Sequence, residues 1–187
     1  MSVFGRIKNL FFSCTAQFTQ TSEDRPLFRL VRERKPQRIV EIGVGTGERT
    51  LRMLEAAVRL HPAGSVLYTG IDLFEARPDK TTGIALKAAH RILKPTKARI
   101  RLVPGDPYSA LARVANSLVG TELLLISSDQ LGGSLDRAWF YVPRLLAPNA
   151  AVFIEGTDPQ SNEPTLQLLS RLEVESLAAK ARPRRAA

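Results

Sequence analysis

Three glycines at alternate positions separate an apolar strand-like run from a polar helix-like start in the stretch RIVEIGVGTGERT, Arg38 to Thr50. The glycines are Gly43, Gly45 and Gly47. A glycine-rich turn between a strand and a helix brings backbone amides close to a ligand, most often a nucleotide. The chemistry to expect at this turn is therefore the binding of a nucleotide-like cofactor.

The spacing of the glycines excludes the common phosphate-binding loops. A dinucleotide fingerprint needs G-x-G-x-x-G, and counted from Gly43 its third glycine falls on Glu48. Counted from Gly45, the last position is Thr50, and no Gly-Lys-Ser/Thr of a P-loop follows. Glu48 and the nearby Glu41 would also repel a pyrophosphate at the start of the next helix. A ligand without phosphate, carrying an ammonium and a sulfonium, avoids this repulsion.

The rest of the chain alternates between short apolar runs and helix-like segments. The runs are mostly apolar on both faces, which is typical of a parallel sheet that is covered on both sides. They are RIVEIG, SVLYTGID, ARIRLVPGD, ELLLIS and AAVFIEG. The helix-like segments between them are residues 48–60, 80–93, 108–118 and 135–146. This alternation predicts an α/β fold, a doubly wound Rossmann-like three-layer sandwich with a mostly parallel sheet.

Acidic and polar residues follow the apolar runs. Ligands in such a sheet gather at the carboxyl ends of the strands, near the point where the strand order reverses. Besides the glycine turn, these ends are Asp72, Gly105 with Asp106, residues 127–130 and residues 155–158. Each position alone has a structural explanation, because Asp, Ser and Gly also cap helices and form turns. Together with the glycine turn they indicate a binding site along one edge of the sheet.

Four segments carry a resemblance to a known family. VEIGVGTG, residues 40–47, resembles the first motif of class I S-adenosylmethionine-dependent methyltransferases. GIDLF, residues 70–74, is similar to the second motif, and VPGDPYSAL, residues 103–111, to the third. Residues 123–156 resemble a longer block of the O-methyltransferase-like members. The resemblance runs from about residue 27 to residue 156 and implies the class I methyltransferase fold, with S-adenosyl-L-methionine as cofactor.

The resemblance also implies a role for each matched residue. The three glycines of the turn would let the backbone pass close to the methionine part of the cofactor, and Glu41 would fix the loop. Asp72 would accept both ribose hydroxyls. Leu73 would lie along the adenine and Asp106 near the adenine amine. Ser127, which aligns with the first Asp of the longer block, is placed in the cofactor site as well.

The longer block departs from the family at catalytically important positions. The family's first Asp is Ser127, its second is Asp129, and its His is Gln130. In metal-dependent members, acids and an amide hold a divalent cation that lowers the pKa of the acceptor hydroxyl. The oxygen ligands left for such a cation are Asp129, Glu155, Asp158 and Asn162, and we expect no metal here. Asp129 is then the candidate general base or acceptor-positioning group, with a role as a loop cap as the equal alternative. His61 and His90 fall on outer helices and are not expected to act as bases.

Composition bounds the class of protein. The chain has 187 residues, of which 44% are hydrophobic and 24% charged, and this suits one globular domain. No apolar run approaches the roughly 20 residues of a membrane-spanning helix, and the N-terminal segment lacks the pattern of a secretory signal. The single Cys14 excludes an internal disulfide framework and a multi-cysteine metal site. These features predict a soluble, cytoplasmic protein.

The net charge of +9 is concentrated at the two ends of the chain. Residues 1–38 contain eight Lys or Arg against three Asp or Glu, and residues 171–187 contain five against two. A strongly basic chain suggests a nucleic-acid partner. Basic ends around a near-neutral centre are more often solvated, so a nucleic-acid partner is possible but not favoured.

Three regions follow from the pattern: an N-terminal helical lid over residues 1–35, a methyltransferase-like α/β domain over residues 36–180 and a basic disordered tail over residues 181–187. The lid contains a predicted helix from an N-cap at Ser22 to Pro36, and its apolar face consists of Leu27, Leu30 and Val31. The lid phenylalanines Phe4, Phe11, Phe12 and Phe18 would roof an apolar substrate or dock the helix to the core or to a second subunit.

The C-terminal part differs from the family, which commonly ends with a helix, strand six and an antiparallel strand seven. Only 31 residues follow Gly156. EPTLQLLSR is expected to form a short helix, and the alternation in LEVESLAA favours a strand over a helix. The last strand of the family is then missing. The exposed sheet edge would meet a partner chain, as in a homodimer, or be covered by the N-terminal segment.

The function predicted from the sequence is S-adenosylmethionine-dependent methyl transfer to a small-molecule acceptor that the sequence does not identify. Acceptor specificity in this fold comes from the lid and from variable loops. One alternative is a binding or scaffold protein that keeps the fold but has lost turnover, which Ser127 and Gln130 suggest. A weaker alternative is a nucleic-acid methyltransferase, although no Asn-Pro-Pro-Tyr/Phe type of motif follows the fourth apolar run.

Overall fold

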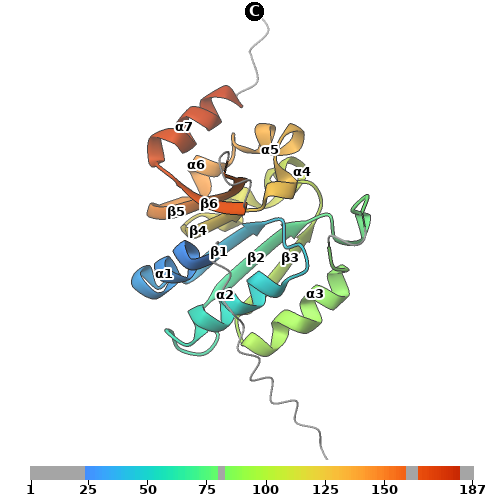
Figure 1. Cartoon of the computed structure of the whole chain (residues 1–187), viewed down its shortest axis with the longest axis vertical. Coiled ribbons are helices and arrows are strands. Elements are labelled where there is room, and N and C mark those ends of the chain that lie inside the picture. The colour runs from blue at the N-terminus through green and yellow to red at the C-terminus, as the bar shows by residue number, and fades with distance from the viewer. Residues whose placement is uncertain (1–23, 80–82, 159–163, 182–187) are drawn as a thin grey trace, which may run out of the picture.

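One sheet runs through the part of the chain that the structure describes, residues 24–79, 83–158 and 164–181 of a computed structural model (Figure 1). Its strands are β1 Arg38–Ile42, β2 Leu67–Asp72, β3 Arg99–Pro104, β4 Thr121–Ile126, β5 Leu146–Thr157 and β6 Pro164–Leu169. Their order in the sheet is β3-β2-β1-β4-β5-β6. The first five are parallel, and β6 pairs antiparallel with β5. The strand order reverses between β1 and β4, because β2 and β3 are added on one side of β1, and β4 to β6 on the other. The carboxyl ends of β1 and β4 therefore form the switch point at which such sheets bind ligands.

Helices cover both faces of this sheet (Figure 1). The first layer consists of α1 Arg25–Arg34, α2 Glu48–Val58 and α3 Leu86–Leu93. The second consists of α4 Pro107–Val114, α5 Gly133–Ala138, α6 Val142–Leu145 and α7 Arg171–Lys180. Short 3-10 turns among the described residues include η2 Phe74–Ala76, η3 Lys94–Thr96, η4 Ala115–Leu118 and η5 Ser128–Gln130. The doubly wound three-layer sandwich predicted from the sequence is confirmed.

Each face of the sheet has its own apolar core. Ile39, Leu123 and Phe153 face the layer of α1 and α2, whereas Val40 and Leu124 face the layer of α4 to α6. Successive strand residues point to opposite faces, which is why the central runs have no polar side. Each buried leucine or isoleucine contributes about 1.5–3 kcal/mol, so the two cores hold the strand ends in place. Within the described residues, no helix has the length and apolar character needed to cross a membrane.

The helix α1 begins after Asp24, and its predicted N-cap, Ser22, lies outside the described residues. The helix ends at Lys35, whose left-handed φ of 48° turns the chain one residue before Pro36. The amide of Lys35 donates to the carbonyl oxygen of Val31 at 3.0 Å. The three apolar residues that were predicted to share one face of this helix are all buried.

Two other predicted helices are shorter in the structure. The sequence predicts one helix over residues 135–146, but α5 and α6 are separated by a turn, and Leu146 already begins β5. Pro143 lies inside that range, has no amide hydrogen and disfavours helical geometry at the residue before it, so one continuous helix cannot run through. The helix predicted over residues 80–93 begins only at Leu86, and residues 80–82 are not described.

The predictions for the two C-terminal segments are wrong, because helix and strand are exchanged. The first segment forms β6 and the second forms α7. The cause is a capping box: the Ser170 hydroxyl accepts from the Glu173 amide at 3.3 Å, and the Glu173 carboxylate accepts from the Ser170 amide at 2.7 Å. This S-x-x-E pattern marks the start of a helix. The described sheet has one strand fewer than the seven of the family, and the strand beside β5 is the antiparallel one.

Candidate functional site

The glycine turn lies at the carboxyl end of β1, in the centre of the sheet, and leads directly into α2. Gly43, Gly45 and Gly47 have φ angles of 92°, 59° and 79°. A Cβ atom on Gly43 would lie 2.6 Å from the Cβ of Ser127 and 2.8 Å from the Cγ of Gln130. Only glycine permits both the positive φ and this close approach. The turn therefore brings the predicted segments 43–47 and 127–130 together.

Asp72, at the end of β2, anchors the turn. Its Oδ2 accepts hydrogen bonds from the amides of Val44 at 2.7 Å and Gly45 at 3.1 Å. Its Oδ1 accepts from the amide of Phe74 at 2.9 Å. The residue is only 1% exposed. The acid assigned to the ribose hydroxyls thus fixes the shape of the glycine turn.

Arg77, which belongs to none of the sequence motifs, covers Asp72. Its Nε donates to Asp72 Oδ1 at 2.6 Å, its Nη2 donates to Asp72 Oδ2, and its Nη1 donates to Asp129. A Cβ on Gly83 would lie 2.5 Å from the Cδ of Arg77, so the glycine there makes room for the arginine. Arg77 therefore joins the predicted ribose-binding acid to the predicted catalytic acid.

The Asp72 carboxylate is held in its charged form. Burial alone would raise the pKa of Asp72. The hydrogen bonds from Arg77 and from the amides of Phe74 and Gly45 outweigh burial and hold the pKa below its ordinary value. Asp72 and Arg77 are 1% and 7% exposed, so the ion pair is buried.

Glu41 supports the turn from behind. The Thr50 hydroxyl and the Tyr68 hydroxyl each donate to Glu41 Oε2 at 2.6 Å, which ties β1 to α2 and β2. Glu41 Oε1 has no hydrogen-bond partner among the described residues, and the nearest cation is Arg49, with its Nε 4.0 Å away. Burial raises the pKa of Glu41 and outweighs the opposing effect of Arg49. Its side chain lies in the layer of α2, beneath the turn.

A second charged cluster lies at the carboxyl end of β5. Glu155 Oε1 accepts from Arg49 Nη1 at 2.9 Å, and Glu155 Oε2 accepts from the Ser127 hydroxyl at 2.7 Å and from the Ser128 amide at 2.9 Å. Burial would raise the pKa of Glu155, but these bonds outweigh it, so the pKa is lowered. Ser127 thus connects β4 to β5 beside the glycine turn.

A cavity of about 260 Å³ opens beside the turn. It is lined by Asp24, Gly43, Val44, Gly45, Thr46, Glu48, Arg49, Arg52 and Ser127. Arg49 and Arg52 line this cavity, and their Nε atoms are buried without a hydrogen-bond partner among the described residues. Arg52 Nη2 donates to Asp24 Oδ2 at 3.0 Å. Two arginines beside a cavity suit a carboxylate, and the only signal for them in the sequence is their place just after the turn.

Asp106 forms the N-cap of α4. Its carboxylate accepts from the amides of Tyr108 and Ser109, each at 3.1 Å, and from the hydroxyls of Ser109 and Ser134. The Ser109 and Ser134 hydroxyls lower the pKa of Asp106 to about 2. Leu73, half-buried, lies between Asp72 and η2. Both predicted adenine-binding residues are therefore at the expected edge, but Asp106 has a structural role as well.

Asp106→Asn is expected to destabilise the protein at pH 6 by about 1 kcal/mol, because a charged N-cap is replaced by a neutral one. A group with a lowered pKa stabilises above its ordinary pKa of about 3.9 and loses that contribution as the pH falls towards 2. The difference between wild type and variant in urea denaturation should therefore shrink as the pH is lowered from 6 to 3. An equal difference at both pH values would contradict the role of the charge.

No group of three or more His, Cys, Asp or Glu side chains among the described residues is arranged to hold a metal ion. Asp129 and Glu155, two of the four candidate ligands, are paired with Arg77 and Arg49. His61 Nε2 lies 2.9 Å from the Lys35 carbonyl oxygen, near the end of α2 and away from the turn. Other features named from the sequence lie outside the described residues: Cys14, Ser22, Asn162, and the phenylalanines of residues 1–23.

The fold has counterparts among solved structures. No protein-family model matches the chain, and neither does any curated protein. A SAM-dependent methyltransferase from Agrobacterium tumefaciens has a similar structure, with a TM-score of 0.53 and 13% identity over 87% of this chain and 50% of that chain. A putative SAM-dependent methyltransferase from Streptococcus mutans has a TM-score of 0.50 and 11% identity over 89% of this chain and 41% of that chain. The chain has the class I methyltransferase fold.

A third solved structure, a SAM-dependent methyltransferase from Thiobacillus denitrificans in complex with S-adenosyl-L-homocysteine, has a TM-score of 0.45 and 14% identity over 71% of this chain and 46% of that chain. This chain therefore spans half or less of the length of each of these three methyltransferases. At these identities the likeness concerns the fold alone. The assignment of a cofactor site therefore depends on the geometry of the glycine turn and of the residues that contact it.

Proposed function

We propose that this chain is an S-adenosylmethionine-dependent methyltransferase that acts on a small-molecule acceptor. The observation that carries the proposal is the glycine turn. It lies at the switch point of a methyltransferase fold, presses against Ser127 and borders a cavity of about 260 Å³. The failed phosphate-binding spacing and the acids Glu41 and Glu48 favour a cofactor without phosphate. We also propose, from the sequence, that the protein forms a homodimer and is cytoplasmic.

The described residues fit one end of this cofactor better than the other. Arg49 and Arg52 line the cavity, so their positive charges suit its carboxylate, and the turn would hold its methionine part. Asp72 would accept the ribose hydroxyls, with Leu73 beside the adenine and Asp106 near the adenine amine. The fit at the ribose requires that Arg77 leaves the Asp72 carboxylate.

When bound, S-adenosylmethionine would supply a methyl group on a sulfonium for in-line displacement by the acceptor. The chain would contribute mainly by holding the acceptor in line. Asp129, just beyond β4, is the group proposed to orient the acceptor or to take its proton at a carboxylate oxygen. One oxygen of Asp129 accepts from Arg77, so the two residues would move together.

The second candidate is a protein that keeps the methyltransferase fold without turnover. The observation that favours it is the Asp72–Arg77–Asp129 bridge, because it occupies both the ribose-binding acid and the catalytic acid. A chain that never releases Arg77 would not bind the cofactor through Asp72. Only the second candidate is compatible with a complete absence of cofactor binding.

Thermal unfolding with added S-adenosylmethionine tests the proposal. A ligand present at 100 times its Kd stabilises the folded chain by about 2.7 kcal/mol. Arg52→Gln removes one cationic donor from the cavity and should weaken binding about tenfold. Arg59→Gln, an exposed arginine after the end of α2, is the control and should bind as wild type does. If no cofactor concentration stabilises the folded chain, the proposed methyltransferase activity is contradicted. The protein of the same fold without turnover would then be the supported candidate.

A further inference from the structure

A second pocket lies at the opposite end of the parallel strands, where β1, β2 and β3 begin. It has a volume of about 240 Å³. Its lining includes Arg38, Arg99 and Arg101, the hydroxyl side chains of Thr69, Ser117 and Thr121, and apolar residues of β1, β2, β3 and η4. The pocket therefore combines apolar side chains with three arginines and with three hydroxyl side chains of Ser and Thr. Nothing in the proposed methyl transfer uses this pocket.

Strand register places the three arginines on one face of the sheet. Arg38 pairs with Leu67, and Leu67 pairs with Arg99, so these residues share a row. Arg101 lies two positions further along β3, on the same face. The residue between them, Ile100, packs instead into the core beneath α2 and α3. The arginines thus gather on the face that carries α4 and η4.

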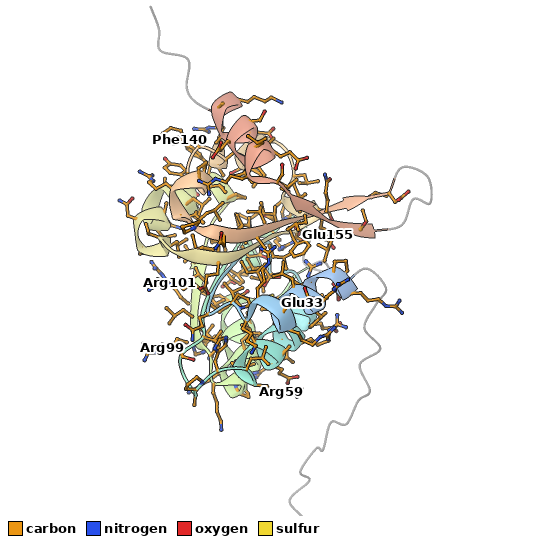
Figure 2. All side chains as sticks on the ribbon, turned by 90° about the vertical axis from the view of Figure 1, so that its left-hand side faces the viewer. Glu33, Arg59, Arg99, Arg101, Phe140 and Glu155 are labelled. Carbon is orange, nitrogen blue, oxygen red and sulfur yellow. The ribbon has the colours of Figure 1, made fainter. Side chains whose placement is uncertain are left out.

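The helix layer leaves this part of the face open. After α4 the chain continues only through η4, Ala115–Leu118, before it enters β4. In Figure 2, Arg99 and Arg101 lie on the left flank of the molecule, and Arg59 lies at its lower end. The concave surface is therefore bounded by β3 and η4, with the strand starts as its floor.

The charge in this pocket is not neutralised. Among the described residues, no acid forms an ion pair with Arg38, Arg99 or Arg101, and no acid lines the pocket. Glu122, which follows the lining residue Thr121, accepts from the amides of Gln37 and Arg38 at 2.5 and 3.1 Å. Three guanidinium groups around one cavity create a strongly positive site.

Two of the guanidinium groups are already positioned by neutral partners. Arg38 Nη1 donates to the Val119 carbonyl oxygen at 3.3 Å, and Arg101 Nη1 donates to the Ser117 hydroxyl at 2.8 Å. Each guanidinium has five N–H donors, so most remain available to a ligand. Fixed arginines lose less side-chain freedom on binding than mobile ones.

We propose that this pocket binds a small phosphorylated anion. Three arginines need a ligand with more than one negative charge, and the planar guanidinium matches phosphate oxygens in pairs. The volume is below the roughly 300–1,000 Å³ of pockets for drug-sized ligands, so it suits a compact anion. Charges on an edge strand also oppose aggregation, but that role needs neither a concavity nor fixed guanidinium groups. The site is separate from the glycine turn and stands without the proposed methyl transfer.

Titration calorimetry with inorganic pyrophosphate, at low ionic strength, tests this site on the full chain. We expect one binding event, because exposed charges attract most strongly when salt does not screen them. Arg99→Gln and Arg101→Gln should each weaken binding about tenfold. Arg59→Gln has the same change of charge outside the pocket and should bind as wild type does. Circular dichroism checks that the variants fold, which their exposed positions favour.

The outcomes separate this proposal from others. No binding of pyrophosphate to wild type would overturn it, and so would an equal loss of affinity in Arg59→Gln, which would indicate unspecific attraction to net charge. Binding of a short single-stranded RNA that pyrophosphate does not displace would overturn it in favour of a nucleic-acid surface. Titration of Arg101→Gln with S-adenosylhomocysteine should match that of wild type, so failure of this site and failure of the proposed function are distinguishable.

Discussion

Asp72→Ala is expected to lower the free energy of unfolding by about 3–5 kcal/mol. The Asp72 carboxylate accepts from the amides of Val44, Gly45 and Phe74 and from two nitrogens of Arg77. Its removal leaves a buried guanidinium without its main partner and three amides without an acceptor. Urea denaturation followed by circular dichroism measures the difference between variant and wild type.

The matched control is Asp136→Ala, an exposed acid in α5, for which a change within about 0.5 kcal/mol is expected. The double variant Asp72→Ala with Arg77→Met should recover part of the loss, because the unpaired charge is gone. If Asp72→Ala costs no more than Asp136→Ala, Asp72 does not anchor the glycine turn.

Acid should weaken the same anchor. The pKa of Asp72 is lowered in the folded chain, so its contribution to stability is present above its ordinary pKa of about 3.9. The contribution is lost as the pH falls through the lowered, folded value. The difference in stability between wild type and Asp72→Ala should therefore decrease below pH 4.

Arg77→Met is expected to raise the affinity for S-adenosylhomocysteine about tenfold, if the Asp72 carboxylate is free in about one wild-type molecule in ten. Ligand binding to wild type must first move Arg77 away from Asp72, and this cost reduces the apparent affinity. Methionine keeps an apolar stem beside Gly83 but removes the charge. Calorimetric titration of variant and wild type gives the ratio of the two dissociation constants.

Arg91→Met, at an exposed arginine of α3, serves as the control and should not change the affinity. The opposite result would be that S-adenosylhomocysteine binds Arg77→Met more weakly than wild type. It would show that Arg77 contributes to the cofactor site and does not block it. Urea denaturation of Arg77→Met separates this result from simple unfolding.

The strands and the glycine turn were predictable because their signals are local. Two-sided apolar runs such as Arg38–Ile42 and Thr121–Ile126 have few alternatives to a buried parallel strand. Glycines directly after such a run predict a tight turn into a helix, and α2 begins at Glu48, where it was expected. The order of the strands then places the strand ends along one edge.

The C-terminal exchange of helix and strand has a local cause that the sequence contains. The alternation of apolar residues after Ser170 favours a strand, but the capping box of Ser170 and Glu173 starts a helix there. β6 forms because the second half of β5 offers it an unpaired edge, and this is a tertiary effect. Propensity alone does not predict it.

Arg77 was not predictable from the motifs. It follows Asp72 by five residues, and only the turn at η2 folds it back over the carboxylate. Gly83 permits this packing, a contact that no sequence pattern encodes. The sequence therefore indicated which acids lie at the edge, but not that Arg77 joins Asp72 to Asp129.

Calorimetric titration of the full chain with S-adenosylhomocysteine tests the central proposal most directly. We expect binding at one site in wild type, and tighter binding in Arg77→Met. Absence of binding to both proteins would contradict a cofactor site at the glycine turn, because Arg77 would then not be the obstacle.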